Sequence, residues 1–352
     1  MDLSVVRRRL EARELLLSPR AAPSRLATRR RHEAADPLRT AFQRDRDRIV
    51  HTKAFRRLKH KTQVFIAPQQ DHYVTRLTHT IEVAQVARTI ARALNLNEDL
   101  AEAAALGHDI GHGPFGHAGE EALAECLPDG FRHNYQSVRV LDRLERGGEG
   151  LNLTLQTLEA VEKSSKVRED IFAEGWGVPA TLEGQVVKVA DAIAYVNHDI
   201  LDAIRAGIIA ETDLPGSARS RLGTAHSERL NSLVSDVVAS SWDSAQEAGS
   251  GNAPAIRMSV TVAAAANELR EFMFQRVYLY ERTRAEAERG KRVVIFLFRH
   301  FERTPDAIES DYCLPDDPPS RRAADFVSGM TDRYAIRLAS ELGCADAQDW
   351  RV

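Results

Sequence analysis

Residues 106–120 read Leu-Gly-His-Asp-Ile-Gly-His-Gly-Pro-Phe-Gly-His-Ala-Gly-Glu, and the rest of the chain is organised around this stretch. It continues an apolar helical pattern at residues 98–106, so the cluster of histidines begins where a helix ends. Gly107 and Gly111 allow the backbone to leave the helix. The sequence therefore predicts a helix that delivers polar side chains at its carboxyl end.

Imidazole nitrogens beside carboxylate oxygens are the donors that suit a divalent cation. We predict that His108 and Asp109 bind such an ion and that His117 and Glu120 act beside it. Adjacent residues on a regular helix point about 100° apart, so one ion reaches both only near a helix end. Four candidate ligands come from three separate helices: His79, His108, Asp109 and Asp191. This nitrogen and oxygen set leaves room for water or substrate oxygens on an octahedral ion and admits Mg, Mn, Fe, Co, Ni or Zn.

The composition is that of an ordinary soluble globular protein, with 352 residues, 43% of them hydrophobic and 28% charged. No apolar run approaches the roughly 20 residues that span a bilayer, and the amino terminus lacks the apolar region of a signal peptide. The cysteines are odd in number, widely spaced and without a CxxC pair: Cys126, Cys313 and Cys344. This pattern argues against a disulfide framework and a thiolate metal site, so we expect a cytoplasmic protein without a membrane partner.

The net charge of −3 is unevenly distributed, because residues 1–62 hold 18 Lys and Arg against 7 Asp and Glu. A basic segment on an acidic body suggests a polyanionic partner, whether a nucleotide, a nucleic acid or an acidic neighbouring subunit. A solvated arginine-rich face is the alternative, and composition alone favours it.

Apolar residues at three- and four-residue steps predict helices over residues 78–95, 98–106 and 182–204. In the carboxyl-terminal part we predict one long helical region over residues 260–288, a short apolar piece at residues 293–298 and a last helix over residues 321–342. There is no βαβ alternation, Gly-rich phosphate loop or repeat, so the fold class is all-α. We expect three parts: a basic, partly mobile arm at 1–35, a core at 36–206 and a mostly helical continuation of the same domain at 207–352.

One side of the helix over residues 182–204 is polar, away from the apolar stripe. It carries Asp191, Tyr195, His198, Asp199 and Asp202. On composition alone, a solvent-exposed face is the simpler interpretation of these residues.

The pattern His79…His108-Asp109…Asp191 resembles the H…HD…D signature of the HD-domain phosphohydrolases. The closer resemblance is to the deoxynucleoside triphosphate triphosphohydrolase (dGTPase-like) branch of that family. Five linked stretches carry it in the right order: residues 44–58, 61–65, 76–80, 107–120 and 190–195. Together they cover roughly residues 36–206 and are far more specific than an HD pair alone. The resemblance implies an HD-domain helical bundle.

The resemblance also implies metal-dependent hydrolysis of a dNTP at the α-phosphorus, which releases a deoxynucleoside and intact tripolyphosphate. It implies a metal site of His79, His108, Asp109 and Asp191 and a catalytic group of His117, Glu120 and His112. Positions that match substrate-binding residues of the family are Gln63, Val64, Arg76, His133, Tyr195 and Asp199. For the helix that carries Asp191, the resemblance favours the wall of a polar pocket over a solvent face.

Two other functions remain open. An HD-family phosphomonoesterase or single-strand nuclease would use the same metal and water on another phosphate. A catalytically silent nucleotide- or nucleic-acid-binding protein would rely on the basic segment, although an intact His117–Glu120 pair argues against it. Members of the family form rings of subunits such as hexamers, and some bind a second, activating nucleotide. Arg56, Arg57 and Lys59 are candidates for such a site or for subunit salt bridges, and single-stranded DNA is a further candidate partner.

Overall fold

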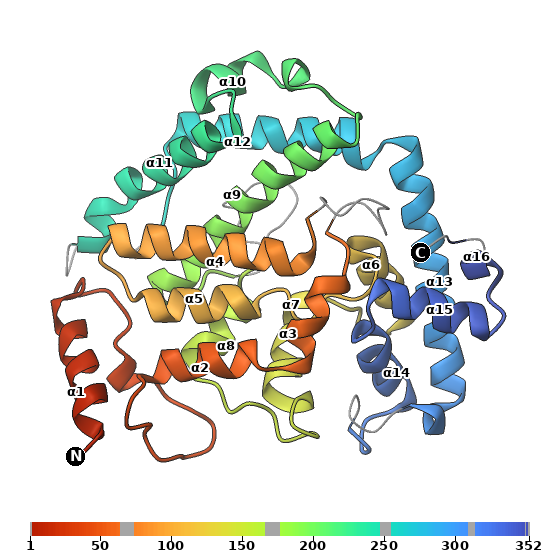
Figure 1. Cartoon of the computed structure of the whole chain (residues 1–352), viewed down its shortest axis with the longest axis horizontal. Coiled ribbons are helices and arrows are strands. Elements are labelled where there is room, and N and C mark those ends of the chain that lie inside the picture. The colour runs from red at the N-terminus through yellow and green to blue at the C-terminus, as the bar shows by residue number, and fades with distance from the viewer. Residues whose placement is uncertain are drawn as a thin grey trace. The chain divides into compact units, whose positions relative to one another are not determined.

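The computed structural model describes residues 2–63, 74–165, 177–246, 255–308, 314–348 and 350. Within these ranges it contains sixteen α-helices, several short 3₁₀ and π-helical turns and no β-strand (Figure 1). Two isolated bridges, Arg29 with Thr154 and Thr62 with Thr75, are its extended pairings. The predicted all-α class is confirmed. None of the helices in the described part of the chain has the length and hydropathy needed to cross a bilayer.

The helices form two compact units, each assembled from several segments of the chain. The first comprises Met1–Val50, Thr80–His108 and Asn152–Val277, and the second comprises His51–His79, Asp109–Leu151 and Tyr278–Val352. The three-part division expected from the sequence remains a prediction.

In the first unit, helix α5 (Glu98–Gly107) packs against α2 (Ala41–Val50), α8 (Leu155–Glu162) and α9 (Leu182–Arg205). Asn97 caps the amino end of α5, since its side chain accepts hydrogen bonds from the backbone N–H groups of Asp99 and Leu100. Most of α5 is buried, which fixes the helix that ends at His108. The other helices that contribute to this unit are α1 (Ser4–Arg13), α4 (Arg76–Ala93), α10 (Gly216–Leu222), α11 (His226–Gln246) and α12 (Val260–Met273).

In the second unit, the long helix α13 (Glu281–Arg303) packs against α6 (Gly116–Cys126), α14 (Pro319–Ser328), α15 (Asp332–Glu341) and α16 (Ala345–Gln348) (Figure 1). Apolar side chains of these helices form one core, among them Leu123, Val294, Leu297, Phe298 and Phe326. The unit also contains α3 (Lys53–Arg57) and α7 (His133–Arg139), and α7 continues into a π-helical turn at Val140–Leu144.

The helices predicted over residues 260–288 and 321–342 are each interrupted. The first ends in a π-helical turn at Phe274–Tyr278, and α13 then starts after an extended Tyr280. The second is divided between α14 and α15, because the Thr331 side chain accepts a hydrogen bond from the Tyr334 N–H and starts a new helix. The apolar piece at residues 293–298 lies inside α13, where it faces the core.

Candidate metal and acid–base site

His108 lies immediately after the last residue of α5 and is 2% exposed. Its ring Nδ1 is 2.6 Å from the carbonyl oxygen of Ala105. Because a carbonyl only accepts, Nδ1 carries the proton and Nε2 keeps its lone pair. A hydrogen bond of this kind from the other ring nitrogen is the usual way in which a metal-binding histidine is oriented.

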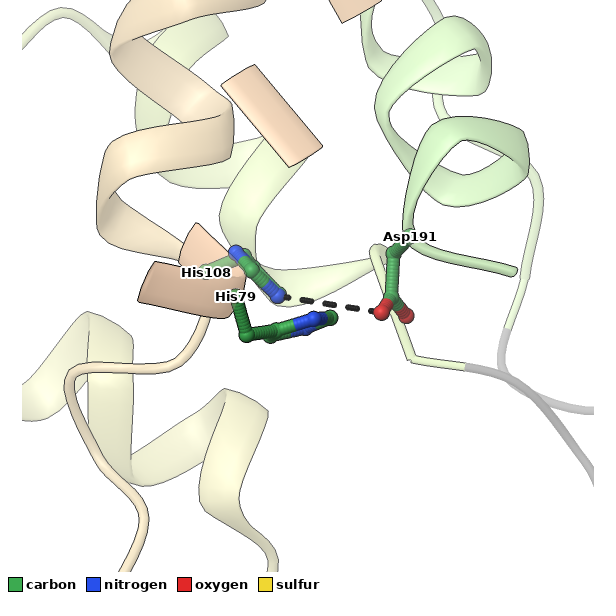
Figure 2. A group of neighbouring side chains, drawn as sticks. All are labelled: His79, His108 and Asp191. Carbon is green, nitrogen blue, oxygen red and sulfur yellow. Dashed lines mark ion pairs between the residues drawn. The ribbon is translucent and has the colours of Figure 1, made fainter. Parts of the chain in front are cut away.

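Figure 2 shows His108 with His79, from the first turn of α4, and Asp191, from α9. Each of the three offers one ligand atom, and these atoms lie within 4.8 Å of one another. His108 Nε2 is 3.9 Å from an Asp191 oxygen, which is longer than a hydrogen bond. Donor atoms that share one ion through bonds of about 2.0–2.2 Å are separated by distances of this order. The donor types, their spacing and the tautomer of His108 therefore fit a divalent metal ion.

Asp109, the fourth predicted ligand, is 4% exposed and is held by Arg76. Arg76 Nη1 donates to Asp109 Oδ2 at 2.7 Å, and His79 Nε2 lies 3.7 Å from the same oxygen. Arg76 is itself 2% exposed. Its guanidinium therefore fixes the orientation of this carboxylate, a role that the sequence did not indicate.

A second histidine–carboxylate group lies in the second unit and consists of His112, His117, Glu120 and His133. Glu120 lies between two imidazoles: His133 Nδ1 is 2.9 Å from one carboxylate oxygen, and His117 Nδ1 is 3.5 Å from the other. The His133 ring stacks on that of His112, with centroids 3.8 Å apart. His117 differs from the others because its side chain is 63% exposed. The structure thus brings the predicted catalytic residues together and adds His133 to them.

The electrostatics of this second group follow from its burial. Burial raises the pKa of Glu120, but the His133 and His117 imidazoles lower it more, so that it lies well below its ordinary value. Burial lowers the pKa of His133, and Glu120 reverses this effect and raises it. The pKa of His112 is well below its ordinary value because of burial and the nearby charges of Arg76 and His133. The group therefore combines a carboxylate whose ionised form is favoured, an imidazole whose protonated form is favoured and an imidazole whose neutral form is favoured.

Gly111 explains how His133 reaches this group. A Cβ atom at residue 111 would lie 2.2 Å from the Ser137 nitrogen and 2.3 Å from the His133 carbonyl oxygen. The Gly111 N–H also donates to Ser137 Oγ at 2.8 Å. The glycine therefore permits the first turn of α7 to pack directly on the backbone of the HD loop. The sequence predicted this glycine as a helix terminator, but its role here is close approach.

Asp332, the first residue of α15, is a buried carboxylate that no sequence pattern singled out. It accepts hydrogen bonds from the Phe115 N–H at 3.0 Å and the Thr62 N–H at 2.9 Å, and a further one from the Thr62 hydroxyl. Burial raises the pKa of Asp332. Phe115 needs such support because it has a left-handed backbone with φ of 62° and directly precedes α6. Asp332 thus holds the start of the helix that carries His117 and Glu120.

The predicted substrate-binding residues have different surroundings. Gln63 is 7% exposed, whereas Val64 lies outside the described residues. On α9, Asp199 is buried and Tyr195 is partly buried, and neighbouring His198 lies 3.2 Å from both Asp199 and Glu82. The polar side of α9 is therefore not a solvent face.

Five arginines of the basic segment, between residues 29 and 48, pair with carboxylates inside the first unit. Arg29 Nη1 lies 2.6 Å from Asp45, and Arg48 lies 2.7 Å from Glu33. Further pairs join Arg39 to Asp36 and Asp47, Arg44 to Glu33, and Arg46 to Asp47 and Glu102. Arg29 is 9% exposed, so this part of the segment is an internal lattice of ion pairs.

Comparison with known proteins assigns the class. The HD domain matches residues 76–196, and the phosphohydrolase-associated domain matches residues 256–341. The fold, the histidine–aspartate group and these matches define the chain as an HD-domain phosphohydrolase.

Proteins of similar sequence show to which family within this class the chain belongs. Deoxyguanosinetriphosphate triphosphohydrolase-like proteins of Caldanaerobacter subterraneus subsp. tengcongensis and Desulfatibacillum aliphaticivorans are 48% and 46% identical to the chain. The alignments cover 93% and 94% of this chain and 92% and 96% of the relatives. A third such protein, from Clostridium tetani, is 45% identical over 88% of this chain and 87% of its own. The chain belongs to the deoxyguanosinetriphosphate triphosphohydrolase-like family, and the resemblance expected from its motifs is confirmed.

Proposed function

We propose that this chain hydrolyses deoxynucleoside triphosphates to a deoxynucleoside and intact tripolyphosphate. The observation that carries the proposal is the presence of two distinct histidine–carboxylate groups, one with the spacing of metal ligands and one joined by hydrogen bonds. Membership of the dGTPase-like family supports the choice of substrate class.

In this proposal His79, His108, Asp109 and Asp191 hold a divalent ion. When bound, such an ion neutralises phosphate charge and makes water more acidic. Arg76 keeps Asp109 oriented through the 2.7 Å hydrogen bond. The buried surroundings of Asp109 and His108 strengthen the attraction between these side chains and a cation.

The second group handles protons and phosphate charge. Glu120 orients the exposed His117 imidazole through Nδ1, which leaves Nε2 to exchange a proton with the attacking water or the leaving 5′-oxygen. His133, stacked on His112, offers an N–H donor to phosphate oxygens. Gln63, Val64, Tyr195 and Asp199 are the proposed contacts of the sugar and triphosphate.

The test is to incubate the metal-loaded protein with each dNTP and NTP and, separately, with a deoxynucleoside monophosphate and a single-stranded oligodeoxynucleotide, and to identify the products by ion chromatography or ³¹P NMR. Tripolyphosphate in equimolar amount with the deoxynucleoside is the expected result. Orthophosphate from a nucleoside monophosphate would indicate a phosphomonoesterase, and shortened single-stranded DNA would indicate a nuclease. Either result without tripolyphosphate would refute the proposal.

Assembly into a ring such as a hexamer, activation by a second nucleotide and binding of single-stranded DNA remain predictions. Light scattering of the purified protein tests the first, and the dependence of turnover on a second dNTP tests the next. The slope of DNA affinity against salt concentration tests whether a basic groove contacts phosphates.

A further inference from the structure

A cavity of about 310 Å³ lies in the second unit and contains none of the predicted metal ligands or catalytic residues in its lining. Its walls come from α3, from the loop after the π-helical turn at Val140–Leu144, and from the carboxyl end of α14. Four basic side chains line it: Lys53, Arg57, Lys61 and Arg146. A volume of this size accommodates a small organic ligand or a phosphorylated metabolite.

The carboxylates in the wall do not balance this charge. Asp325 is engaged by Arg139 at 2.9 Å and by Arg321 at 2.7 Å, and neither arginine lines the cavity. Glu145 accepts a hydrogen bond from the Ala54 N–H at 3.1 Å. The lining of the cavity therefore contains more basic than acidic side chains.

Lys61 and Arg57 also cap the end of α14. The Lys61 amino group donates to the Ser328 carbonyl at 2.9 Å and to the His112 carbonyl, and Arg57 donates to the Gly329 carbonyl at 3.1 Å. Burial lowers the pKa of Lys61 to about 7, so the positive charge of the cavity comes chiefly from the other three basic side chains. Lys53, at the start of α3, and Arg146, in the loop after the π-helical turn, bring two basic side chains to the cavity in addition to those that cap α14.

The wall that carries Arg146 has an unusual backbone. Arg146 adopts a left-handed conformation with φ of 58°, and it lies two residues after the π-helical turn at Val140–Leu144. Both features are uncommon for ordinary residues and occur preferentially at functional sites. This backbone brings a further basic side chain to a cavity already lined by Lys53, Arg57 and Lys61, as expected of a site built for an anion.

We propose that this cavity binds a phosphate group, whether as free inorganic phosphate or as the phosphate of a small metabolite, between Lys53, Arg57 and Arg146. Of the basic residues that the sequence suggested for a second ligand, Arg57 lines the cavity and Arg56 and Lys59 do not. Lys61, which also lines the cavity, donates to the carbonyl of His112, so the cavity wall is hydrogen-bonded to the backbone of the acid–base group.

The test uses the full chain freed of metal with a chelator, so that binding is measured without turnover and independently of the proposed hydrolysis. Isothermal titration with inorganic phosphate and, separately, with deoxyadenosine monophosphate distinguishes the two sources of the phosphate group. We expect saturable binding of one or both by the unsubstituted protein. The double variant Lys53→Ala/Arg146→Asn should weaken it at least about tenfold, since each charge-assisted hydrogen bond contributes strongly to affinity.

Asparagine suits residue 146 because it tolerates a left-handed backbone, and both substituted side chains are exposed, so the fold is retained. Arg56→Ala is the matched control: it removes an exposed charge from the same helix but not from the cavity. Equal affinity in the double variant and the unsubstituted protein would overturn the proposal. So would the absence of saturable binding of either probe at millimolar concentration.

Discussion

The two histidine–carboxylate groups contain the same kinds of side chain but differ in the distance between the imidazole nitrogen and the carboxylate oxygen. In the first group, His79 and His108 stand 3.7 and 3.9 Å from the nearest oxygens of Asp109 and Asp191. In the second, His133 contacts Glu120 directly at 2.9 Å. Distances of the first kind suit donors that share an ion, whereas the second kind is a hydrogen bond in which a proton occupies the space.

This difference teaches that histidine content does not define a metal site. Asp109, His112 and His133 also place three ligand atoms within 4.8 Å of one another. However, the rings of His112 and His133 are stacked with an interplanar angle of 14°, so their in-plane lone pairs run nearly parallel and do not converge on one ion. We therefore interpret the second group as an acid–base site and the first as the metal site.

The largest expected effect comes from Asp109→Ala. It removes a ligand and leaves the buried Arg76 guanidinium without its carboxylate partner, so we expect loss of bound metal and a fall in turnover of about a thousandfold or more. Metal content by mass spectrometry and the rate of deoxynucleoside release measure both. Asp243→Ala, at an exposed position of α11, is the control. Full metal occupancy in the Asp109 variant would contradict the assignment of this ligand.

The variant His117→Ala should distinguish the role of the second group in turnover from the role of the first group in metal binding. Loss of a general acid or base lowers turnover by about 10²–10⁴-fold. We expect metal content and nucleotide affinity to stay unchanged, because the exposed His117 side chain is not among the proposed ligands. His32→Ala, at an exposed residue, is the control. Unchanged turnover would remove His117 from the mechanism, and loss of metal would show that the two groups are not independent.

The sequence predicted the parts of these groups that depend on local backbone. His108 and Asp109 follow a strongly patterned helix with a recognisable Asn97 cap, and the structure places them at its end. The association of His133 with Glu120 could not be predicted in this way. It depends on the packing of α7 against Gly111, a contact between segments whose sequences do not indicate that they meet.

Contacts between residues far apart in the sequence explain why other features of the structure could not be predicted. Asp332 and Thr62 are 270 positions apart in the chain, so no local pattern marks their hydrogen bonds. The excess of arginine in the amino-terminal segment suggested a polyanion partner. The ion pairs of Arg29 and Arg48 show that the number of basic residues in this segment was less informative than the positions of the carboxylates that pair with them.

A smaller effect is expected from Asp332→Asn. An amide keeps one acceptor oxygen but presents an NH₂ group to one of the N–H donors of Thr62 and Phe115, which costs about 1–3 kcal/mol of stability. Because Phe115 starts α6, we expect a reduced kcat with unchanged metal content. Urea unfolding and single-turnover kinetics measure the two effects, with exposed Asp306→Asn as the control. Loss of metal together with kcat would show that Asp332 supports both groups rather than the second alone.

The smallest expected effect comes from His198, whose imidazole, like that of His133, lies next to carboxylates. Burial lowers its pKa, but Asp199 and Glu82 outweigh burial and raise it to about 9. The folded protein thus binds the proton more tightly than the unfolded chain, whose histidine pKa is about 6.5. The resulting stabilisation is present below about pH 6.5 and is lost as the pH rises towards 9. It amounts to about 2 kcal/mol, since Glu82 is 46% exposed and screened.

The variant His198→Gln isolates this term, because glutamine has no charge to lose. Urea unfolding of metal-free protein at pH 6, 8 and 9.5 should show a difference in unfolding free energy between the unsubstituted protein and the variant that shrinks as the pH rises. Subtracting the two curves cancels the titration of all other groups that the substitution does not touch. A difference that is constant with pH would mean that the pKa of His198 is the same in the folded and the unfolded protein. A direct imidazole–carboxylate contact would then not suffice to raise the pKa of a buried histidine, and the raised pKa of His133 would lose its support.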